Sequence, residues 1–143
     1  MRLLFEEPMV FVCRDDHRLA RRKHLHMRDL ATEDLVGFPP GFGLRRLMDN
    51  AFDTAGVRAQ TQYEVPAGFA AIAELVGNGL GTAFMPVSEA HQFEGLTPIK
   101  LTEQVVWQVY MASPPAAAMT PATARLADIL LDAATRARGQ RAR

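Results

Sequence analysis

Residues 73–86 read Ala-Glu-Leu-Val-Gly-Asn-Gly-Leu-Gly-Thr-Ala-Phe-Met-Pro, and they place the end of a helix, a glycine turn and a strand in immediate succession. The helix is predicted to begin at Pro66, and its inward face consists of Phe69, Ile72, Leu75 and Val76. Three glycines then end the helix, and residues 82–85 form a short strand that stops at Pro86. A dinucleotide-binding fingerprint has the opposite order, because its strand comes before the glycines. The stretch therefore predicts a tight turn from a helix back into a sheet.

The same alternation of strands and helices continues upstream. Residues 9–13 form an apolar run typical of a strand that is covered on both faces, and residues 35–38 form a second short strand. A helix follows, because apolar side chains recur at helical spacing at Leu44, Leu47, Met48, Ala51, Phe52 and Ala55. Residues 57–65 then alternate between two faces, which predicts a half-exposed strand.

Downstream of Pro86 the pattern predicts a short helical turn at 87–91, strands near 99–101 and 105–112, and a last helix. Thr120 is placed to cap that helix and Pro121 to begin it. The predicted inner face of the helix consists of Ala122, Leu126, Ile129, Leu130 and Ala133. Strands that alternate with helices in this way predict an α/β fold with a substantially parallel sheet.

The composition restricts the classes of partner. The chain has 143 residues, 16 basic and 16 acidic, and 48% of its residues are hydrophobic. This balanced charge argues against direct binding to nucleic acid, which normally requires a basic excess on one face. The single cysteine, Cys13, lies in an apolar run, so it is predicted to be buried, and no internal disulfide can form. Because no membrane-spanning stretch or signal peptide is recognisable, we expect a cytoplasmic protein without a membrane partner.

Residues with catalytic or metal-binding chemistry are few, and they form no recognisable set. His24 and His26 could present two nitrogens on one side of a strand, but a zinc site needs three or four ligands, so a surface turn is favoured. Cys13, Asp15 and His17 match a thiol triad by residue type alone, because such spacing does not make side chains converge. We therefore expect no catalytic residue, no metal ligand and no cofactor, and we expect that the chain is not an enzyme.

Two connections between a strand and a helix are the best candidates for ligand binding. The first is the segment 38–45, Phe-Pro-Pro-Gly-Phe-Gly-Leu-Arg, and Pro66-Ala67-Gly68 repeats its geometry. The N–H groups at the start of a helix are unpaired and attract carboxylates or phosphates, and Gly41 and Gly43 would let a ligand approach the backbone. The alternative, that both segments are ordinary connecting turns, stays equally open on this evidence.

The motifs resemble LysR-type transcriptional regulators in their order and spacing. Residues 4–12, Leu-Phe-Glu-Glu-Pro-Met-Val-Phe-Val, followed by Asp16-His17-Arg18-Leu19-Ala20, resemble a strand of that family and its His-Pro-Leu-Ala-like turn, with Arg18 in place of the usual proline. Residues 73–86 closely resemble the family's Leu-Val-x-x-Gly-x-Gly-Ile-x-x-x-Pro signature. The resemblance covers about residues 2–134. We expect no counterpart here for the family's N-terminal winged helix-turn-helix, its linker helix or the first part of its effector domain.

The resemblance implies an α/β fold like a type 2 periplasmic binding protein, in which two lobes with mixed, mainly parallel sheets and flanking helices close on a small molecule. Residues 1–135 would be a partial effector-binding domain, with 8–102 mostly in the second lobe. Residues 103–135 would supply the return strand and final helix of the first lobe, and 136–143 a basic C-terminal tail. Half of the ligand cleft is therefore expected to be absent. The positions expected to bind the effector are Pro40, Gly41, Phe42, Gly43, Pro66, Ala67, Gly68, Phe84, Met85 and Pro86.

Two functions follow from the resemblance. The first is a ligand-sensing regulatory domain that binds a small anionic metabolite, such as a carboxylate, and controls the conformation of a DNA-bound homodimer or higher homo-oligomer. DNA would be contacted only through the N-terminal domain. The second is a truncated regulator that acts only as a self-association module, through exposed sheet edges or the face of the helix at residues 44–55.

Overall fold

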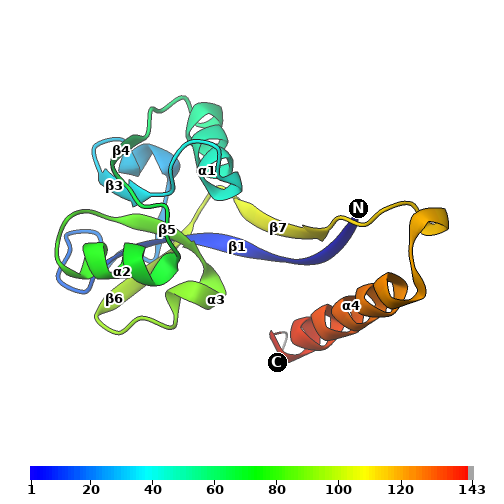
Figure 1. The fold of residues 1–143 in the computed structure, drawn as a ribbon. Helices are drawn as coiled ribbons and strands as arrows, with labels where there is room; N and C mark the ends of the chain where they lie inside the picture. The colour runs from blue at the N-terminus through cyan, green and yellow to red at the C-terminus, as the bar shows by residue number, and fades with distance from the viewer. Residues whose placement is uncertain (142–143) are drawn as a thin grey trace. The chain divides into compact units, whose positions relative to one another are not determined.

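The computed structural model describes residues 1–141, with side chains described to residue 137, and it confirms an α/β fold with a mixed sheet (Figure 1). The strands are β1 (Arg2–Arg14), β2 (His24–Leu25), β3 (Asp34–Gly37), β4 (Gln60–Glu64), β5 (Ala83–Pro86), β6 (Leu96–Leu101) and β7 (Val106–Met111). The α-helices are α1 (Gly43–Thr54), α2 (Phe69–Gly77), α3 (Val87–Ala90) and α4 (Pro121–Arg141), and single 3-10 turns span Met27–Leu30 and Ala116–Ala118.

Strand β1 organises the larger sheet. It runs antiparallel to β5 on one side and to β6 on the other, and β2 extends the sheet beyond β6 in the parallel sense. Strands β3 and β4 form a separate parallel pair, which is joined to the larger sheet by a parallel bridge between Leu35 and Thr82. The apolar run of β1 correctly predicted burial on both faces, but periodicity carries no information about the direction of the neighbouring strands.

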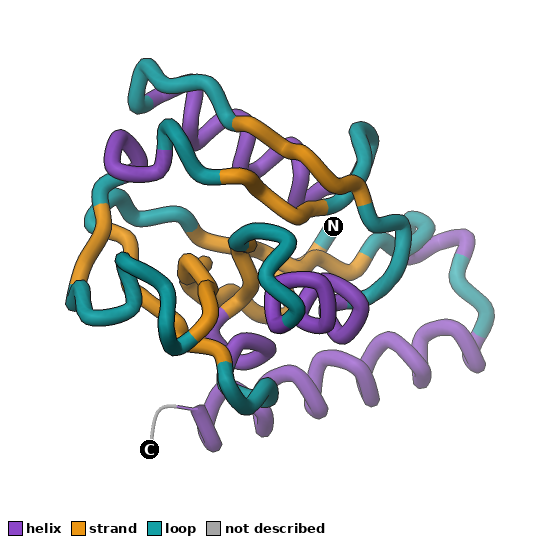
Figure 2. The backbone as a smooth tube through the Cα atoms, turned by 90° about the vertical axis from the view of Figure 1, so that its left-hand side faces the viewer, coloured by secondary structure: helices purple, strands orange, loops and turns teal. Residues whose placement is uncertain are grey.

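The side chains on the two faces of β1 belong to two separate apolar clusters. Met9, Phe11 and Cys13 point into a cluster with Met48 and Phe52 of α1, and Figure 2 shows α1 running alongside the β3–β4 pair. Val10 and Val12 point into a second cluster, whose other main members are Ile72 and Val76 of α2 and Met85 of β5. The helices α1 and α2 therefore lie on opposite faces of the sheet, as an alternating strand buried on both sides requires.

The glycine turn between α2 and β5 has the tight geometry that its sequence predicts. Gly81 has a φ of +157°, and a Cβ atom there would lie 2.3 Å from the carbonyl oxygen of Asp34. That oxygen accepts a hydrogen bond from the N–H of Thr82 at 2.9 Å, while the N–H of Val36 donates to the carbonyl of Thr82 at 2.8 Å. Only glycine allows the two backbones to approach this closely.

The turn after β1 is held by a buried carboxylate. Glu33 is 5% exposed, and it pairs with the Nε2 of His17 at 3.3 Å and with Arg18. The Nδ1 of His17 accepts the N–H of Leu19 at 3.2 Å, so the imidazole is fully engaged in this turn. Arg18, which departs from the family pattern, thus neutralises an acid that would be costly to bury alone.

The chain divides into two compact units. One consists of residues Glu7–Trp107, and the other combines Met1–Glu6 with Gln108–Arg143. The expected division into parts of two lobes, with residues 8–102 mostly in the second lobe, stays a prediction. Among the helices of the described residues, none combines the length and apolar content needed to cross a lipid bilayer.

Helix α4 begins as predicted but does not bury the expected face. The hydroxyl of Thr120 accepts the N–H of Thr123 at 3.2 Å, which confirms the cap. Leu126, Ile129 and Leu130 are 56%, 49% and 42% exposed, and Ala127 is the buried position instead. An apolar stripe is buried only where another element covers it, and helical spacing does not say whether that element is present. The expected basic tail at 136–143 is helical through Arg141, and 142–143 lie outside the described residues.

Candidate functional site

Two of the three predicted segments lie together at one edge of the β3–β4 pair. The strands are parallel, and Gly37 at the end of β3 is paired with Glu64 at the end of β4. The N–H of Val65 continues this pairing by donating to the carbonyl of Gly37 at 2.8 Å. Because both strands end at the same edge, residues 38–42, which lead into α1, and 65–68, which lead into α2, emerge side by side.

The starts of both helices offer backbone donors. The N-cap residues are Phe42 for α1 and Gly68 for α2, and among the described residues no side-chain hydrogen bond caps either helix. Neither first turn contains an acidic residue. The first N–H groups of an α-helix have no acceptor inside the helix and carry partial positive charge, so these two starts suit an anionic group. Gly41, with a φ of +97°, makes the turn that leads into α1.

A row of aromatic rings adjoins the helix starts. Phe42 is stacked on Phe38, with ring centroids 5.4 Å apart and planes 13° apart. Phe38 and Phe69 form an edge-to-face pair with ring centroids 5.5 Å apart, and Phe69 and Trp107 form another with centroids 6.4 Å apart. Phe42 is 42% exposed, so the row ends on an accessible ring. Phe38 begins the candidate segment 38–45, whereas Phe69 and Trp107 were not predicted, and the only signal for Phe69 was an aromatic residue beside the start of a helix.

Arg45 connects the segments around this row. Its guanidinium donates to the carbonyl of Phe38 at 3.1 Å, to Glu64 at 3.0 Å and to Asp49 at 2.9 Å. Burial disfavours the charged form and lowers the pKa of Arg45, but the hydrogen bonds and charges of Glu64 and Asp49 outweigh burial and raise that pKa above its ordinary value. The side chain is therefore a permanent cation, already balanced by two carboxylates.

The third predicted segment, in β5, lies in the core. Met85 has 0% exposure in the cluster beneath α2, and Pro86 is also fully buried. Phe84 is half-buried between Phe11 and Phe52, with ring centroids 5.7 Å from each. The side chains of Met85 and Pro86 therefore cannot touch a ligand in this arrangement, because a strand that ends at a ligand-binding edge still buries its own alternating side chains.

The site at the helix starts is open rather than enclosed. Beneath it, a cavity of about 30 Å³ is lined by Phe38, Leu44, Arg45, Phe84 and their neighbours. This is room for about one water molecule.

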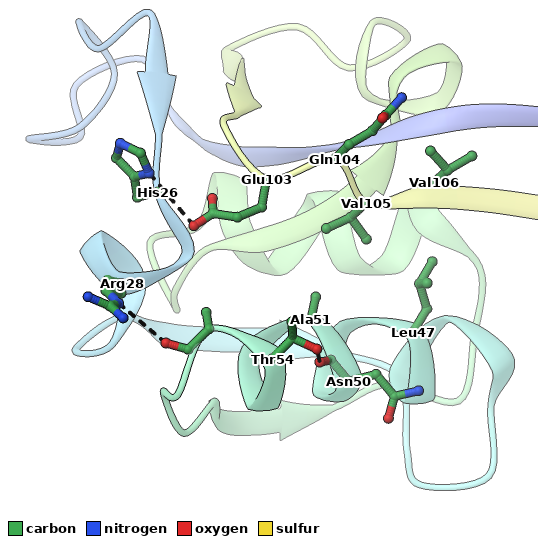
Figure 3. Close-up of a pocket in the computed structure, with 11 residues that line it drawn as sticks. His26, Arg28, Leu47, Asn50, Ala51, Thr54, Glu103, Gln104, Val105 and Val106 are labelled. Carbon is green, nitrogen blue, oxygen red and sulfur yellow. Dashed lines mark hydrogen bonds and ion pairs between the residues drawn. The ribbon is translucent and has the colours of Figure 1, made fainter.

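A larger groove lies on the other side of α1, where no ligand was predicted. Its volume is about 560 Å³, and Figure 3 shows it between α1 and the segment 103–106. Apolar side chains of Leu47 and Val105 line it, and polar groups stand at one end. There, Glu103 accepts the N–H of Met27 at 3.0 Å and lies 3.7 Å from His26. Glu103 and His26 are therefore paired with each other, while Arg28, which donates to the carbonyl of Ala55 at 3.3 Å, brings a positive charge to the same end of the groove.

The described residues hold no group of three or more metal-ligating side chains. His17 is engaged by Glu33, and the buried Sγ of Cys13 lies 4.0 Å from the carbonyl oxygen of Thr97. Burial, together with the negative charges of Glu33 and Asp15, raises the pKa of the Cys13 thiol to about 11. A thiol with this pKa is almost entirely protonated at neutral pH and is a poor nucleophile.

The sequence matches a known protein family along most of its length. The family described as "LysR substrate binding domain" matches residues 1–135. Among curated proteins, the chain is 31% identical over 108 residues to the uncharacterised HTH-type transcriptional regulator YybE of Bacillus subtilis, a match that covers 75% of this chain and 35% of YybE. It is 32% identical over 87 residues to the transcriptional dual regulator GltC of the same organism, covering 61% of this chain and 29% of GltC. The chain thus spans about a third of the length of these relatives.

Solved structures show the same fold at low identity. The effector-binding domain of QuiR in complex with shikimate matches with a TM-score of 0.76 at 20% identity, covering 94% of this chain and 65% of that one. The regulatory domain of CcmR from Synechocystis, in complex with 2-PG, matches with a TM-score of 0.75 at 19% identity, covering 93% and 65%. About a third of each of these structures has no counterpart in the match.

Proposed function

Because the chain belongs to the LysR substrate-binding domain family, we propose that it is the ligand-sensing part of a transcriptional regulator and that it binds a small anionic metabolite where α1 and α2 begin. The observation that carries this proposal is the pair of uncapped helix starts, brought together by the parallel strands β3 and β4. The structures of QuiR with shikimate and of CcmR with 2-PG support it by analogy, because those relatives hold small molecules.

In the proposed complex, a carboxylate accepts hydrogen bonds from the first N–H groups of α1, and the exposed ring of Phe42 covers an apolar part of the ligand. The contacts come from residues 40–43 and 66–68, while β5 supports the site from within the core. No step in this proposal is chemical, so the protein is a receptor and not an enzyme. The names of the relatives YybE and GltC describe transcriptional regulators, which supports the proposed role as a receptor.

Binding would act on transcription by favouring one arrangement of the regulator over another. A ligand shifts such an equilibrium only by its difference in affinity for the two arrangements, typically about 1–3 kcal/mol. DNA would be contacted by an N-terminal domain of the kind that the HTH designation of YybE names. The proposal places the protein in the cytoplasm, as part of a homodimer or higher homo-oligomer.

The proposal is tested by titrating aromatic and aliphatic carboxylates while following the amide resonances of Gly41, Phe42, Gly43 and Gly68. The sharpest variant is Gly43→Pro. Gly43 is the first helical residue, where proline removes one N–H without disturbing the helix, and Phe42 already has the φ of −74° and ψ of 140° that a following proline needs. We expect G43P to weaken binding by about tenfold or more, because it removes one charge-assisted hydrogen bond.

Gly43→Ala is the matched control, because it keeps the N–H and because a Cβ atom there meets no atom within 4 Å. It should weaken binding much less than G43P does. Equal affinities of G43P and wild type would place the anion elsewhere, and the absence of site-specific shifts across the whole panel would refute the proposal. Shifts centred on Leu47, Asn50 and Val105 would instead assign the ligand to the groove of Figure 3.

Self-association is the second candidate function, and the exposure of β4 favours it. Within the described sheets, β4 pairs only with β3, and four of its five residues are exposed, including Tyr63 at 45%. An open strand edge of this kind can pair with another chain. Light scattering over a range of concentrations tests this function directly, and a monomer at the highest concentration would exclude it.

A further inference from the structure

Arg45 forms a clamp that ties three segments of the candidate site together. One nitrogen of its guanidinium, Nη1, donates to both the carbonyl of Phe38 at 3.1 Å and Glu64 at 3.0 Å. Its Nε donates to the two carboxylate oxygens of Asp49 at 2.9 and 3.0 Å. Phe38 follows β3, Asp49 lies in α1 and Glu64 ends β4, so a single planar group connects all three elements.

The position of Arg45 is unusual for a cation. It is the third residue of α1, close to the positive end of the helix dipole, where a basic side chain is unfavourable. The side chain is only 20% exposed, while Asp49 and Glu64 are 42% and 45% exposed. A residue that opposes the local preference and is held by three partners indicates a tertiary role rather than a solvated surface charge.

That role concerns the aromatic rings beside the helix starts. Arg45 holds the backbone carbonyl of Phe38 by a hydrogen bond. The ring of Phe38 in turn packs against the rings of Phe42 and Phe69. The guanidinium itself is balanced by two carboxylates, so a ligand at the start of α1 meets backbone N–H groups and the Phe42 ring. Arg45 therefore controls the shape of the site without contributing a free charge to it.

We infer that Arg45 is a positioning residue for the effector, and that the Phe38–Phe42 pair it holds makes the site select a planar ring carboxylate over a saturated one. The inference rests on the proposed function, in which an anion binds at the start of α1. An aromatic ligand ring that packs on Phe42 gains the quadrupole interaction of an aromatic pair, which a saturated ring of similar size cannot make. Lysine cannot replace Arg45, because a single ammonium group does not reproduce a planar fork that serves three partners at once.

Arg45→Lys tests the inference, with Arg46→Lys as the matched control, since Arg46 is the next residue and is exposed. The first readout is amide hydrogen exchange of Phe42 and Val65 in the ligand-free protein, because their N–H groups donate to the carbonyls of Pro39 and Gly37 on either side of the clamped residue Phe38. We expect exchange to be about tenfold faster in R45K and unchanged in R46K, because only the first loses the clamp on the loop. The second readout is the ratio of the affinities for benzoate and cyclohexanecarboxylate. That ratio should favour benzoate in wild type and R46K and fall towards one in R45K.

Several outcomes would overturn the inference. One is unchanged exchange and selectivity in R45K, and another is an equal change in R46K. If R45K does not fold, Glu64→Ala replaces it, because Glu64 is exposed and alanine removes the acceptor of one arm of the clamp; the same changes should then appear at smaller size. If neither carboxylate binds the wild type, the choice of ligand class is wrong, while the exchange data still decide whether Arg45 holds the loop. If both carboxylates bind elsewhere on the protein, the proposed site is wrong, even if the exchange data show that Arg45 holds the loop.

Discussion

Gly81→Ala should destabilise the protein far more than an ordinary change from glycine to alanine. The new Cβ atom would lie 2.3 Å from the Asp34 carbonyl oxygen, about 1 Å inside the normal separation of a carbon and an oxygen atom. Relief requires β3 and β5 to move apart, which breaks the hydrogen bonds between Thr82 and Asp34 and between Val36 and Thr82. Each bond contributes about 0.5–1.5 kcal/mol, and the strained φ of +157° adds about 1–3 kcal/mol for a non-glycine residue.

The expected loss is therefore about 2–6 kcal/mol in the free energy of unfolding. Urea denaturation followed by far-ultraviolet circular dichroism measures it, and hydrogen exchange at the amides of Val36 and Thr82 shows whether the bridge has opened. Gly77→Ala is the control, because a Cβ atom at Gly77 meets nothing within 4 Å and the residue lies at the end of α2. Alanine there should leave stability unchanged or raise it by up to about 1 kcal/mol. A loss below about 1 kcal/mol in G81A, or an equal loss in G77A, would show that the close approach of the two backbones is not what requires Gly81.

Thr82→Val should raise the free energy of unfolding by about 1 kcal/mol, because the buried Thr82 hydroxyl has no hydrogen-bond partner among the described residues; thermal unfolding measures the change, and a destabilised variant would contradict it. Stability should fall between pH 9 and 11, since the Cys13 thiol ionises near its ordinary pKa of 9.0 when unfolded but only at about 11 when folded. The protonated thiol contributes about 3 kcal/mol to the free energy of unfolding below pH 9, and this contribution is lost as the pH rises through 11. Cys13→Val should remove this part of the pH profile, and a profile that is unaltered in the variant would refute the prediction. Leu126→Gln should lower the free energy of unfolding by less than about 0.5 kcal/mol, because Leu126 is 56% exposed. Phe52→Ala should lower it by about 3–5 kcal/mol, because Phe52 is 1% exposed. Similar losses for the two variants in urea denaturation would contradict this difference in burial.

Much of the fold was predictable because local patterns report local structure. The helical stripe from Leu44 to Ala55 became α1, the glycines after α2 form the predicted turn, and Thr120 caps α4. The direction of β1 was not predictable, because alternation of side chains is the same in parallel and antiparallel strands. The exposure of Ile129 was not predictable either, since burial of a stripe depends on a partner element and not on the stripe itself.

Part of the candidate site could also be predicted from the sequence, and part could not. The two loops could be predicted, because each follows a strand and begins a helix, and parallel pairing then brings them together. The burial of Met85 was missed, since its place near a strand end says nothing about which face it occupies. The aromatic row and the Arg45 clamp join residues that are far apart in the chain, such as Phe38 and Phe69 or Arg45 and Glu64. Contacts of this kind depend on tertiary packing, which the local patterns of one sequence do not report.

The aromatic row has one more consequence, which concerns how the protein can be observed. Trp107 is the only tryptophan in the chain, and its indole meets Phe69, the first residue of α2, at 6.4 Å. Selective excitation of tryptophan therefore reads out one known place in the molecule, with no background from other indoles. Any event that moves the start of α2 changes the surroundings of that fluorophore. The protein carries its own optical reporter beside the edge where the loops into α1 and α2 meet, and no label has to be attached to use it.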